Sequence, residues 1–232
     1  MIERRNPYRF ELLFADPDEI SDISSLERRA DRPWDRARWL GTLPGDWDRQ
    51  RAPLMSHPKQ KALRRHLVDG VPWRETGLYE IILKGIRERG MCDGCRNLRD
   101  IERRYSDLDR TYDRIRADGR LRVPWELEPG PSAQATGVRV RLDRQGRIMF
   151  AGRGNHRLAL AKMLEHPIPV ALHIAHPQAV RDGHLECLRR RRDEILRDLG
   201  LELPKHALGV PRVVPRFILR RLAHERPETL GP

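Results

Sequence analysis

The spacing of apolar residues predicts a run of helices between residues 57 and 119. The segments 57–70 and 75–90 each place a glycine where a helix usually ends. Between residues 98 and 115, apolar or aromatic residues follow one another at spacings of 3, 4, 3, 4 and 3, which is the a/d pattern of an amphipathic helix. Since this pattern covers fewer than three heptads, we expect the helix to lie on a sheet. A coiled coil is the alternative.

Residues 1–55 show no sustained period of apolar positions. We expect an irregular arm with short helices, one of them around residues 19–29. The arm contains three tryptophans, and disordered segments are usually poor in aromatic residues. We therefore expect these side chains to anchor the arm on a core: Trp34, Trp39 and Trp47.

After residue 137 the period of the apolar positions falls to two, which is typical of a strand with one buried face. Val138, Val140 and Leu142 alternate with charged residues, and Ile148 and Phe150 resume the alternation after the turn sequence DRQG. This segment therefore predicts a β-hairpin.

An apolar helix is predicted directly after the hairpin. Residues 158–164 are apolar almost all round, and Pro167 stops the helix. Residues 168–174 then alternate again, which puts Ile174 on the same face as Ile168. The unit is strand, buried helix, strand, and we expect a right-handed crossover between two parallel strands.

Near the C-terminal end, residues 184–200 predict an amphipathic helix with five apolar side chains toward the core: Leu185, Leu188, Ile195, Leu196 and Leu199. The arginine run 189–192 is expected on its solvated face, and a basic, partly apolar stretch after Pro204 predicts a short terminal helix. The fold class is therefore α+β, with a small mixed sheet that contains the hairpin and the strand-helix-strand unit. We divide the chain into a helical or irregular N-terminal region packed on the core, a central α/β domain and a basic helical extension: residues 1–97, 98–178 and 179–232.

The positive net charge favours an anionic partner but does not identify its chemical class. The formal net charge is +12, and clustered cations favour polyanions such as nucleic acids. Only five of the 46 Lys and Arg residues are lysines, and such an arginine bias also arises from a GC-rich genome. No stretch approaches the roughly 18 apolar residues of a membrane span, and the first residues lack a secretory signal. A cytoplasmic protein without a membrane partner is expected.

Cys92 and Cys95 form a single CxxC motif, and Cys187 is far away in sequence. A tetrahedral zinc ion needs four ligands, and no second CxxC or HxxxH accompanies this pair. We therefore expect a glycine-containing turn with two reduced thiols and no zinc. Cys92 and Cys95 stay the candidates should a metal be bound.

The stretch FAGRGNHRLALAKML, residues 150–164, carries the chemistry that is most suggestive of function. A helix that begins near residue 155 leaves its first amides without internal partners and favours an anion there. Arginine adds forked hydrogen bonds to phosphate, and histidine adds a donor or a base. The alternative is that Asn155 only caps the helix and that the glycines only permit a sharp turn. The anion site would consist of Gly152, Arg153, Gly154, Asn155, His156 and Arg157.

The order of elements over residues 108–176 resembles the ParB/sulfiredoxin superfamily, specifically its ParB-like nucleotide-binding domains. The resemblance rests on the helix that ends in YDRIRADG, the hairpin strand that runs into Gly152 and the His156–Arg157 pair, and the strand IPVALHI. It implies that nucleotide phosphates bind at this turn. We accordingly expect ATP or CTP with Mg²⁺ as candidate cofactors, and we keep a homodimer as a candidate assembly. The matching positions are Gly154, Asn155, His156 and Arg157.

Two departures from the superfamily narrow this expectation. Sulfiredoxins have a cysteine where this chain has Asn155, so sulfinic-acid reduction is not expected. About 58 residues follow Ile174, which is too few for the DNA-binding body and the dimerisation domain of a chromosome-partition ParB protein.

Three functions remain open at this stage. The first is a nucleotide or phosphorylated-metabolite binder that hydrolyses the nucleotide or transfers a phosphoryl group. Its candidate catalytic side chains are His156, Asp143 and Glu126, and the strand-end histidines His173 and His176 are secondary candidates. The second is a DNA- or RNA-binding protein or nuclease that uses the arginine run 189–192 and the arginine cluster from Arg216 to Arg221. The third is a non-catalytic interaction module in which the apolar seam of residues 98–115 binds a partner helix.

Overall fold

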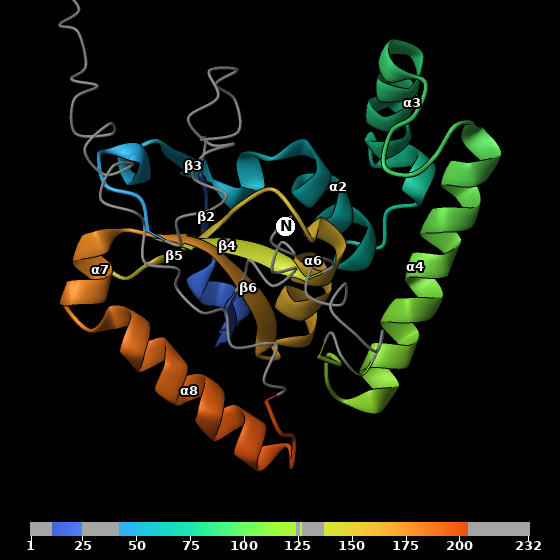
Figure 1. Ribbon diagram of the computed structural model, residues 1–232. Coiled ribbons are helices and arrows are strands. Elements are labelled where there is room, and N and C mark those ends of the chain that lie inside the picture. The colour runs from blue at the N-terminus through green and yellow to red at the C-terminus, as the bar shows by residue number, and fades with distance from the viewer. Residues whose placement is uncertain (1–10, 25–41, 124–125, 127–136, 204–232) are drawn as a thin grey trace, which may run out of the picture.

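The computed structural model describes residues 11–24, 42–123, 126 and 137–203. These residues form an α+β fold in which helices pack against one mixed sheet (Figure 1). The strands are β1 (Glu11–Ala15), β2 (Asp22–Ser24), β3 (Arg51–Pro53), β4 (Val138–Leu142), β5 (Ile148–Phe150) and β6 (Ile168–Ala175). The helices are α2 (Pro58–Leu67), α3 (Leu78–Arg89), α4 (Leu98–Asp118), α6 (Asn155–Leu164), α7 (Pro177–Arg181) and α8 (His184–Asp198). Single 3₁₀ turns are η1 (Pro17–Glu19), η3 (Trp47–Arg49), η4 (Leu54–Ser56) and η5 (Trp73–Glu75).

The sheet has six strands in the order β1-β6-β4-β5-β2-β3. The predicted hairpin is β4–β5, which pair antiparallel, and β6 pairs parallel with β4. The mixed sheet and the α+β class are therefore confirmed. Among the described helices, none is long and apolar enough to cross a membrane.

The crossover prediction is wrong in one respect, because the strands that α6 connects are antiparallel. The hairpin reverses the chain between β4 and β5. Since β6 then pairs parallel with β4, it runs opposite to β5. The parallel pair is β4 and β6, and β5, the second strand of the hairpin, lies in the sequence between β4 and the start of α6.

Three strands come from the region that we expected to be an irregular arm. β1 pairs antiparallel with β6, β2 pairs parallel with β5, and β3 pairs antiparallel with β2. A helix around residues 19–29 is wrong for Asp22–Ser24, which is a strand, and residues 25–29 lie outside the described part. Trp47 is buried as expected. Trp34 and Trp39, like the stretch after Pro204, fall outside the described residues.

Register in β6 corrects the predicted alternation. The pairing with β4 shifts between Val140 and Arg141, so that Val140 lies opposite Leu172 and Arg141 lies opposite Ile174. This irregularity moves Ile174 off the face that carries Ile168. Ile174 packs instead with Leu43, Trp47 and Met149 in a small separate cluster.

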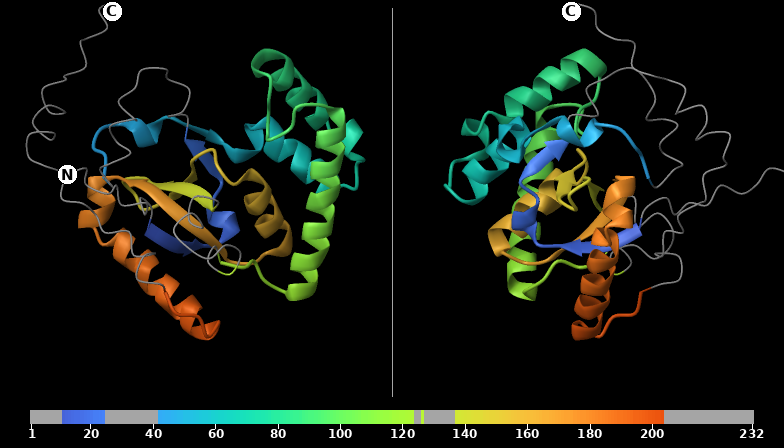
Figure 2. Two further views of the ribbon diagram at one scale, coloured as in Figure 1. Left: turned by 45° about the vertical axis from the view of Figure 1, so that its right-hand side comes forward. Right: turned by 90° about the vertical axis from the view of Figure 1, so that its left-hand side faces the viewer.

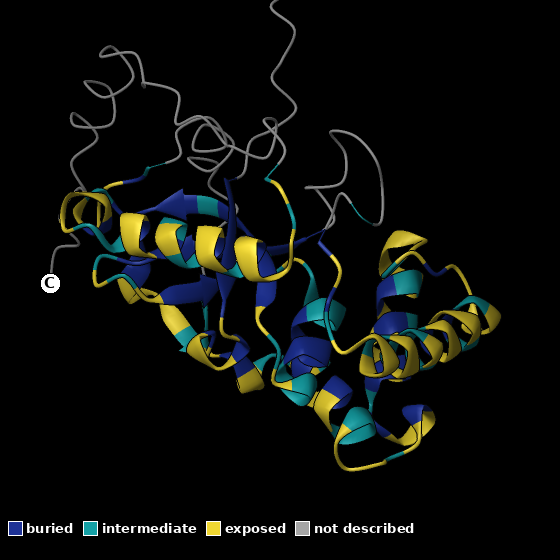
Figure 3. Ribbon diagram, turned by 90° about the horizontal axis from the view of Figure 1, so that it is seen from below, coloured by how far each residue is buried: buried dark blue, intermediate teal, exposed yellow. Residues whose placement is uncertain are grey.

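Helices α2, α3 and α4 form a group beside α6, whereas α8 runs along β1 (Figure 2). The seam of α4 does not lie on the sheet as expected. Ile101 and Tyr105 are fully buried against side chains of α2, α3 and α6. Figure 3 shows the result: α4 and α8 turn exposed residues outward, and the strands between the helices are mostly buried.

One member of the arginine run on α8 is not solvated. Arg192 is 5% exposed, and its Nη1 lies 3.3 Å from Glu11 Oε1 of β1. Arg189 pairs with the same carboxylate through Nε at 2.6 Å. A buried cation is tolerated when a hydrogen-bonded carboxylate compensates it, so this pair fixes α8 on β1.

Candidate functional site

The turn between β5 and α6 has the sharp geometry that the glycines predict. Gly152 and Gly154 both have positive φ, at 78° and 88°. A Cβ atom on Gly154 would lie 2.6 Å from Val138 Cα, which is closer than real Cβ contacts. The turn therefore packs directly on the backbone of β4, and only glycine fits at residue 154.

The alternative in which Asn155 caps the helix is wrong. Gly154 is the N-cap and Asn155 is the first helical residue. The Asn155 side chain is held elsewhere: its Oδ1 accepts a hydrogen bond from Gln60 Nε2 of α2 at 3.0 Å, and its Nδ2 donates to Gly152 O at 3.4 Å. Among the described residues, no side chain caps α6, so the dipole at this end is not offset by a local acceptor.

The arginines of the turn differ in their surroundings. Arg157 donates from Nη2 to the backbone carbonyl of Arg122 at 3.2 Å, which ties the first turn of α6 to the segment after α4. Arg153 is exposed, and its carbonyl accepts from Arg139 N at 3.0 Å. One arginine thus lies along the helix start, and the other extends from the turn into solvent.

His156 points into a buried polar cluster that joins four segments of the chain. Its Nε2 lies 3.7 Å from Asp93 Oδ2 and 3.4 Å from the Tyr105 hydroxyl. The other carboxylate oxygen of Asp93 pairs with Lys59 Nζ at 2.7 Å. Asp93 Oδ2 also accepts from Tyr105 Oη at 2.8 Å and from Arg104 Nε at 3.3 Å. We call Lys59, Asp93, Arg104, Tyr105 and His156 the Asp93 cluster.

Burial sets the protonation states in the Asp93 cluster. Burial, together with the charge of Lys59, lowers the pKa of His156 to about 3, although Asp93 opposes this. Burial raises the pKa of Asp93, but the hydrogen-bonded Lys59 ammonium and the neighbouring His156 and Arg104 together lower it below its usual value. Burial and Asp93 raise the pKa of Tyr105. At neutral pH His156 is therefore a neutral imidazole, with one nitrogen that donates and one that accepts a hydrogen bond, and it is a poor base.

A polar pocket of about 340 Å³ lies beside His156. Its wall comes from α4 and from the turn that carries the CxxC motif, and it includes Cys95, Asp100, Arg103, Arg104, Asp107 and Thr111. Charges of both signs line it, and Arg104 links it to the Asp93 cluster. The first turn of α6 thus has a polar cavity next to it.

The CxxC motif forms the expected tight turn. Cys92 and Cys95 exchange both backbone hydrogen bonds, at 3.0 and 2.8 Å, and Asp93 and Gly94 have φ of 53° and 76°. Within the described ranges, no group of three or more His, Cys, Asp or Glu side chains could hold a metal ion. The visible role of the turn is to present Asp93 to Lys59 and Tyr105.

The remaining candidate carboxylates serve local structure. Asp143 is fully buried in the hairpin turn, where its Oδ1 accepts from the backbone N–H groups of Gln145 and Arg147. Glu126 accepts from Arg120 Nη1 at 2.8 Å and from Val123 N at 2.8 Å. Neither carboxylate contacts the turn before α6 in these interactions.

The structure does not bring His176 to the helix start. Its backbone N–H donates to the carbonyl of Leu142, the last residue of β4, whereas Val138 is the first residue of that strand. The Nδ1 atom of His176 accepts a hydrogen bond from Gln178 N and so caps α7. Gly154 packs on Val138. Because β6 runs antiparallel to β5, its C-terminal end lies away from the turn. His173 lies at the register shift of β6.

Sequence reasoning missed Lys59, Gln60, Asp93, Arg104 and Tyr105. Tyr105 was visible only as a seam residue, and Asp93 only as part of a turn. Their meeting depends on how α2, α4 and the CxxC turn pack around α6, and no local spacing encodes that packing. A weak signal was present in Tyr105 itself, because a buried tyrosine hydroxyl requires a hydrogen-bond partner.

The free energy of unfolding should fall as the pH is lowered from about 6.5 to about 5. The pKa of a histidine in the unfolded state is about 6.5, whereas the pKa of His156 in the folded state is about 3. The unfolded state holds more protons in this window, so acidification removes up to about 1.4 kcal/mol per pH unit. Urea unfolding at pH 7, 6 and 5 measures the slope. His156→Gln should flatten it, and an unchanged slope in this variant would contradict the assignment.

Comparisons with known proteins do not assign this chain to a family. No family model, no curated protein and no solved structure matches the chain.

Proposed function

We propose that this protein binds a phosphorylated small molecule at the first turn of α6, with nucleotides such as ATP or CTP as the first class to test. The observation that carries the proposal is the geometry of Gly154, which starts α6 against β4 without a side-chain cap. A helix N-terminus of this kind favours a phosphate. The resemblance to ParB-like nucleotide-binding domains leads to the same residues.

The neighbouring side chains suit such a ligand. Arg157 can replace its hydrogen bond to the Arg122 carbonyl by a charge-assisted bond to phosphate. Arg153 is exposed beside the turn, and neutral His156 can donate one hydrogen bond. The polar pocket next to His156 offers space for the rest of the molecule. A Mg²⁺ ion would be held chiefly through the phosphates themselves.

The proposal covers binding and assigns no reaction. His156 is held neutral by burial, and Asp143 and Glu126 are engaged in their own turns. Hydrolysis or phosphoryl transfer would require a base other than these three side chains.

The two alternative functions draw less support from the described residues. In α8, Arg189 and Arg192 pair with Glu11, and Arg191 pairs with Glu19, which reduces the charge available to nucleic-acid phosphates. The arginine cluster from Arg216 to Arg221 lies outside the described part. The seam of α4 buries Ile101 and Tyr105 within the protein, so it does not offer a free face to a partner helix.

Isothermal titration with ATP and CTP, each with Mg²⁺, should show binding with a Kd below about 1 mM. Arg157→Ala should weaken it about tenfold, because one charge-assisted hydrogen bond is worth roughly 1.4 kcal/mol. Arg190→Ala is the control, since Arg190 is exposed on α8 and its Nη2 donates a hydrogen bond to Cys187 Sγ, at 3.3 Å, on the same helix. Absence of binding at millimolar nucleotide, or equal weakening by both variants, would contradict the proposal.

A further inference from the structure

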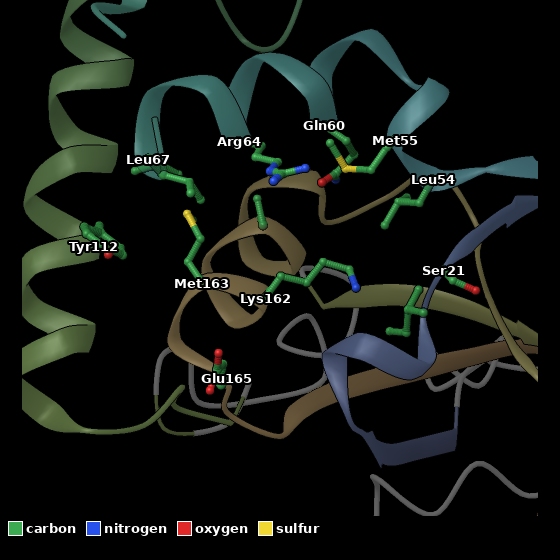
Figure 4. Close-up of a pocket in the computed structure, with 13 residues that line it drawn as sticks. Ser21, Leu54, Met55, Gln60, Arg64, Leu67, Tyr112, Lys162, Met163 and Glu165 are labelled. Carbon is green, nitrogen blue, oxygen red and sulfur yellow. The ribbon is translucent and has the colours of Figure 1, made fainter. Parts of the chain in front are cut away.

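A second and larger pocket lies between α2 and the C-terminal half of α6 (Figure 4). Its volume is about 640 Å³, which is within the range of small-molecule sites, roughly 300–1,000 Å³. Ala159, Lys162 and Met163 of α6 form one wall. Tyr112 of α4 closes one side, and Leu54 stands at the other.

Most of the wall is apolar. Ile20 and Leu54 are at most 1% exposed and form the inner end of the pocket, whereas Met55 at the entrance is 38% exposed. Met163 extends toward Leu67 across the space (Figure 4). Thioether side chains adapt to differently shaped apolar ligands. A wall of this composition favours a hydrocarbon or aromatic body over a polar one.

Two cations and one acid interrupt the apolar wall. Lys162 Nζ is already bonded to the Pro17 carbonyl at 2.5 Å and lies 3.5 Å from Asp18. Glu165 is exposed at the far end of the pocket. Arg64 extends from α2 along the groove toward Gln60 (Figure 4), and no carboxylate of the described residues forms an ion pair with it. A guanidinium beside an apolar cavity is complementary to a carboxylate on an apolar body.

We propose that this pocket binds a small amphipathic carboxylic acid of the medium-chain fatty-acid type. Its hydrocarbon lies between α2 and α6, and its carboxylate pairs with Arg64. This site is distinct from the first turn of α6 and does not depend on phosphate binding there.

Titration of the full chain with decanoate tests the proposal, and decyltrimethylammonium, of the same chain length and opposite charge, is the matched ligand. Decanoate should bind with one-to-one stoichiometry and displace the fluorescent anion 1-anilinonaphthalene-8-sulfonate. Decyltrimethylammonium should bind at least tenfold more weakly. Absence of decanoate binding at about 1 mM, or equal affinity for both amphiphiles, would overturn the proposal.

Two pairs of variants locate the binding. Met55→Trp places a larger side chain in the entrance and should reduce the decanoate affinity at least tenfold. Met91→Trp is its control, because Met91 is 51% exposed and lies outside the pocket. Arg64→Gln should weaken binding about tenfold, and Lys61→Gln, an exposed cation on the same helix, should not.

Met55 and Arg64 have exposed positions on the surface, so these variants are expected to fold, and circular dichroism checks this directly. Equal decanoate binding by all four variants would place the ligand elsewhere and overturn the assignment. Sedimentation velocity adds a further outcome: a dimer that dissociates in Met55→Trp would show that a second copy of the chain covers the pocket, which also overturns it.

Discussion

Gly154→Ala should lower the free energy of unfolding by about 3 kcal/mol or more. The residue has φ of 88°, which costs an alanine roughly 1–2 kcal/mol by itself. A methyl group would also lie 2.6 Å from Val138 Cα. Because that atom belongs to a buried central strand, it cannot move without disturbing the pairing of β4 with β5 and β6.

Gly183→Ala is the matched control for this substitution. Gly183 is also a left-handed N-cap, with φ of 81° before α8, but nothing lies within 4 Å of a Cβ built there. Gly183→Ala should therefore lower the free energy of unfolding by the conformational cost alone, roughly 1–2 kcal/mol. Urea unfolding of both variants separates the backbone contact from the conformational cost. Equal losses would show that the contact with Val138 does not determine the choice of glycine.

The sequence predicted best those elements whose start and end are both marked by local residues, such as a capping side chain, a glycine or a turn residue. The helix expected from residue 98 is α4, whose start is capped by the Asn97 side chain and whose end is Gly119 in the left-handed conformation. The hairpin was also confirmed, because its turn residue Asp143 and the alternation on each side are local features. Local chemistry was enough for each of these elements.

The strands of the N-terminal region could not be predicted in the same way. All five residues of β1 are buried, so it shows no alternation of apolar and polar positions. β2 and β3 have three residues each, which is too short for any period to be recognised. Their positions are fixed by pairing with distant strands, β1 with β6 and β2 with β5.

Charged residues were the other source of error, because a charge pattern alone does not show which side chains are paired. Arg192 belongs to a run that predicts a solvated face, yet it is buried against Glu11, which is 181 residues away in sequence. The same holds for the candidate site. Its glycine turn was recognisable locally, whereas the contact of His156 with Asp93 required knowledge of the tertiary packing.

Asp93→Asn should destabilise the protein by about 3 kcal/mol at pH 7, because it leaves the Lys59 ammonium without its carboxylate partner. The two side chains are only 16% and 18% exposed, and their charged atoms are 2.7 Å apart. Asparagine tolerates positive φ as well as aspartate does, so the φ of 53° at this position adds no strain. Asp107→Asn is the control. Its carboxylate is 54% exposed in a pair with Arg110, and its loss should cost less than about 1 kcal/mol.

The double variant Lys59→Met/Asp93→Asn distinguishes an unpaired buried charge from a general loss of packing. Removing Lys59 eliminates the uncompensated ammonium, so the double variant should be more stable than Asp93→Asn alone. Burial lowers the pKa of Lys59, and losing Asp93 lowers it further. In the folded state of Asp93→Asn, Lys59 therefore loses its proton at a lower pH than in the unfolded state, where its pKa is about 10.4. The stability of this variant should rise as the pH increases toward about 10.4. Urea unfolding at pH 7 and 9 measures both effects. If Asp93→Asn is no less stable than Asp107→Asn, or if its stability does not rise with pH, the Asp93 cluster does not hold α2 and α4 around the start of α6.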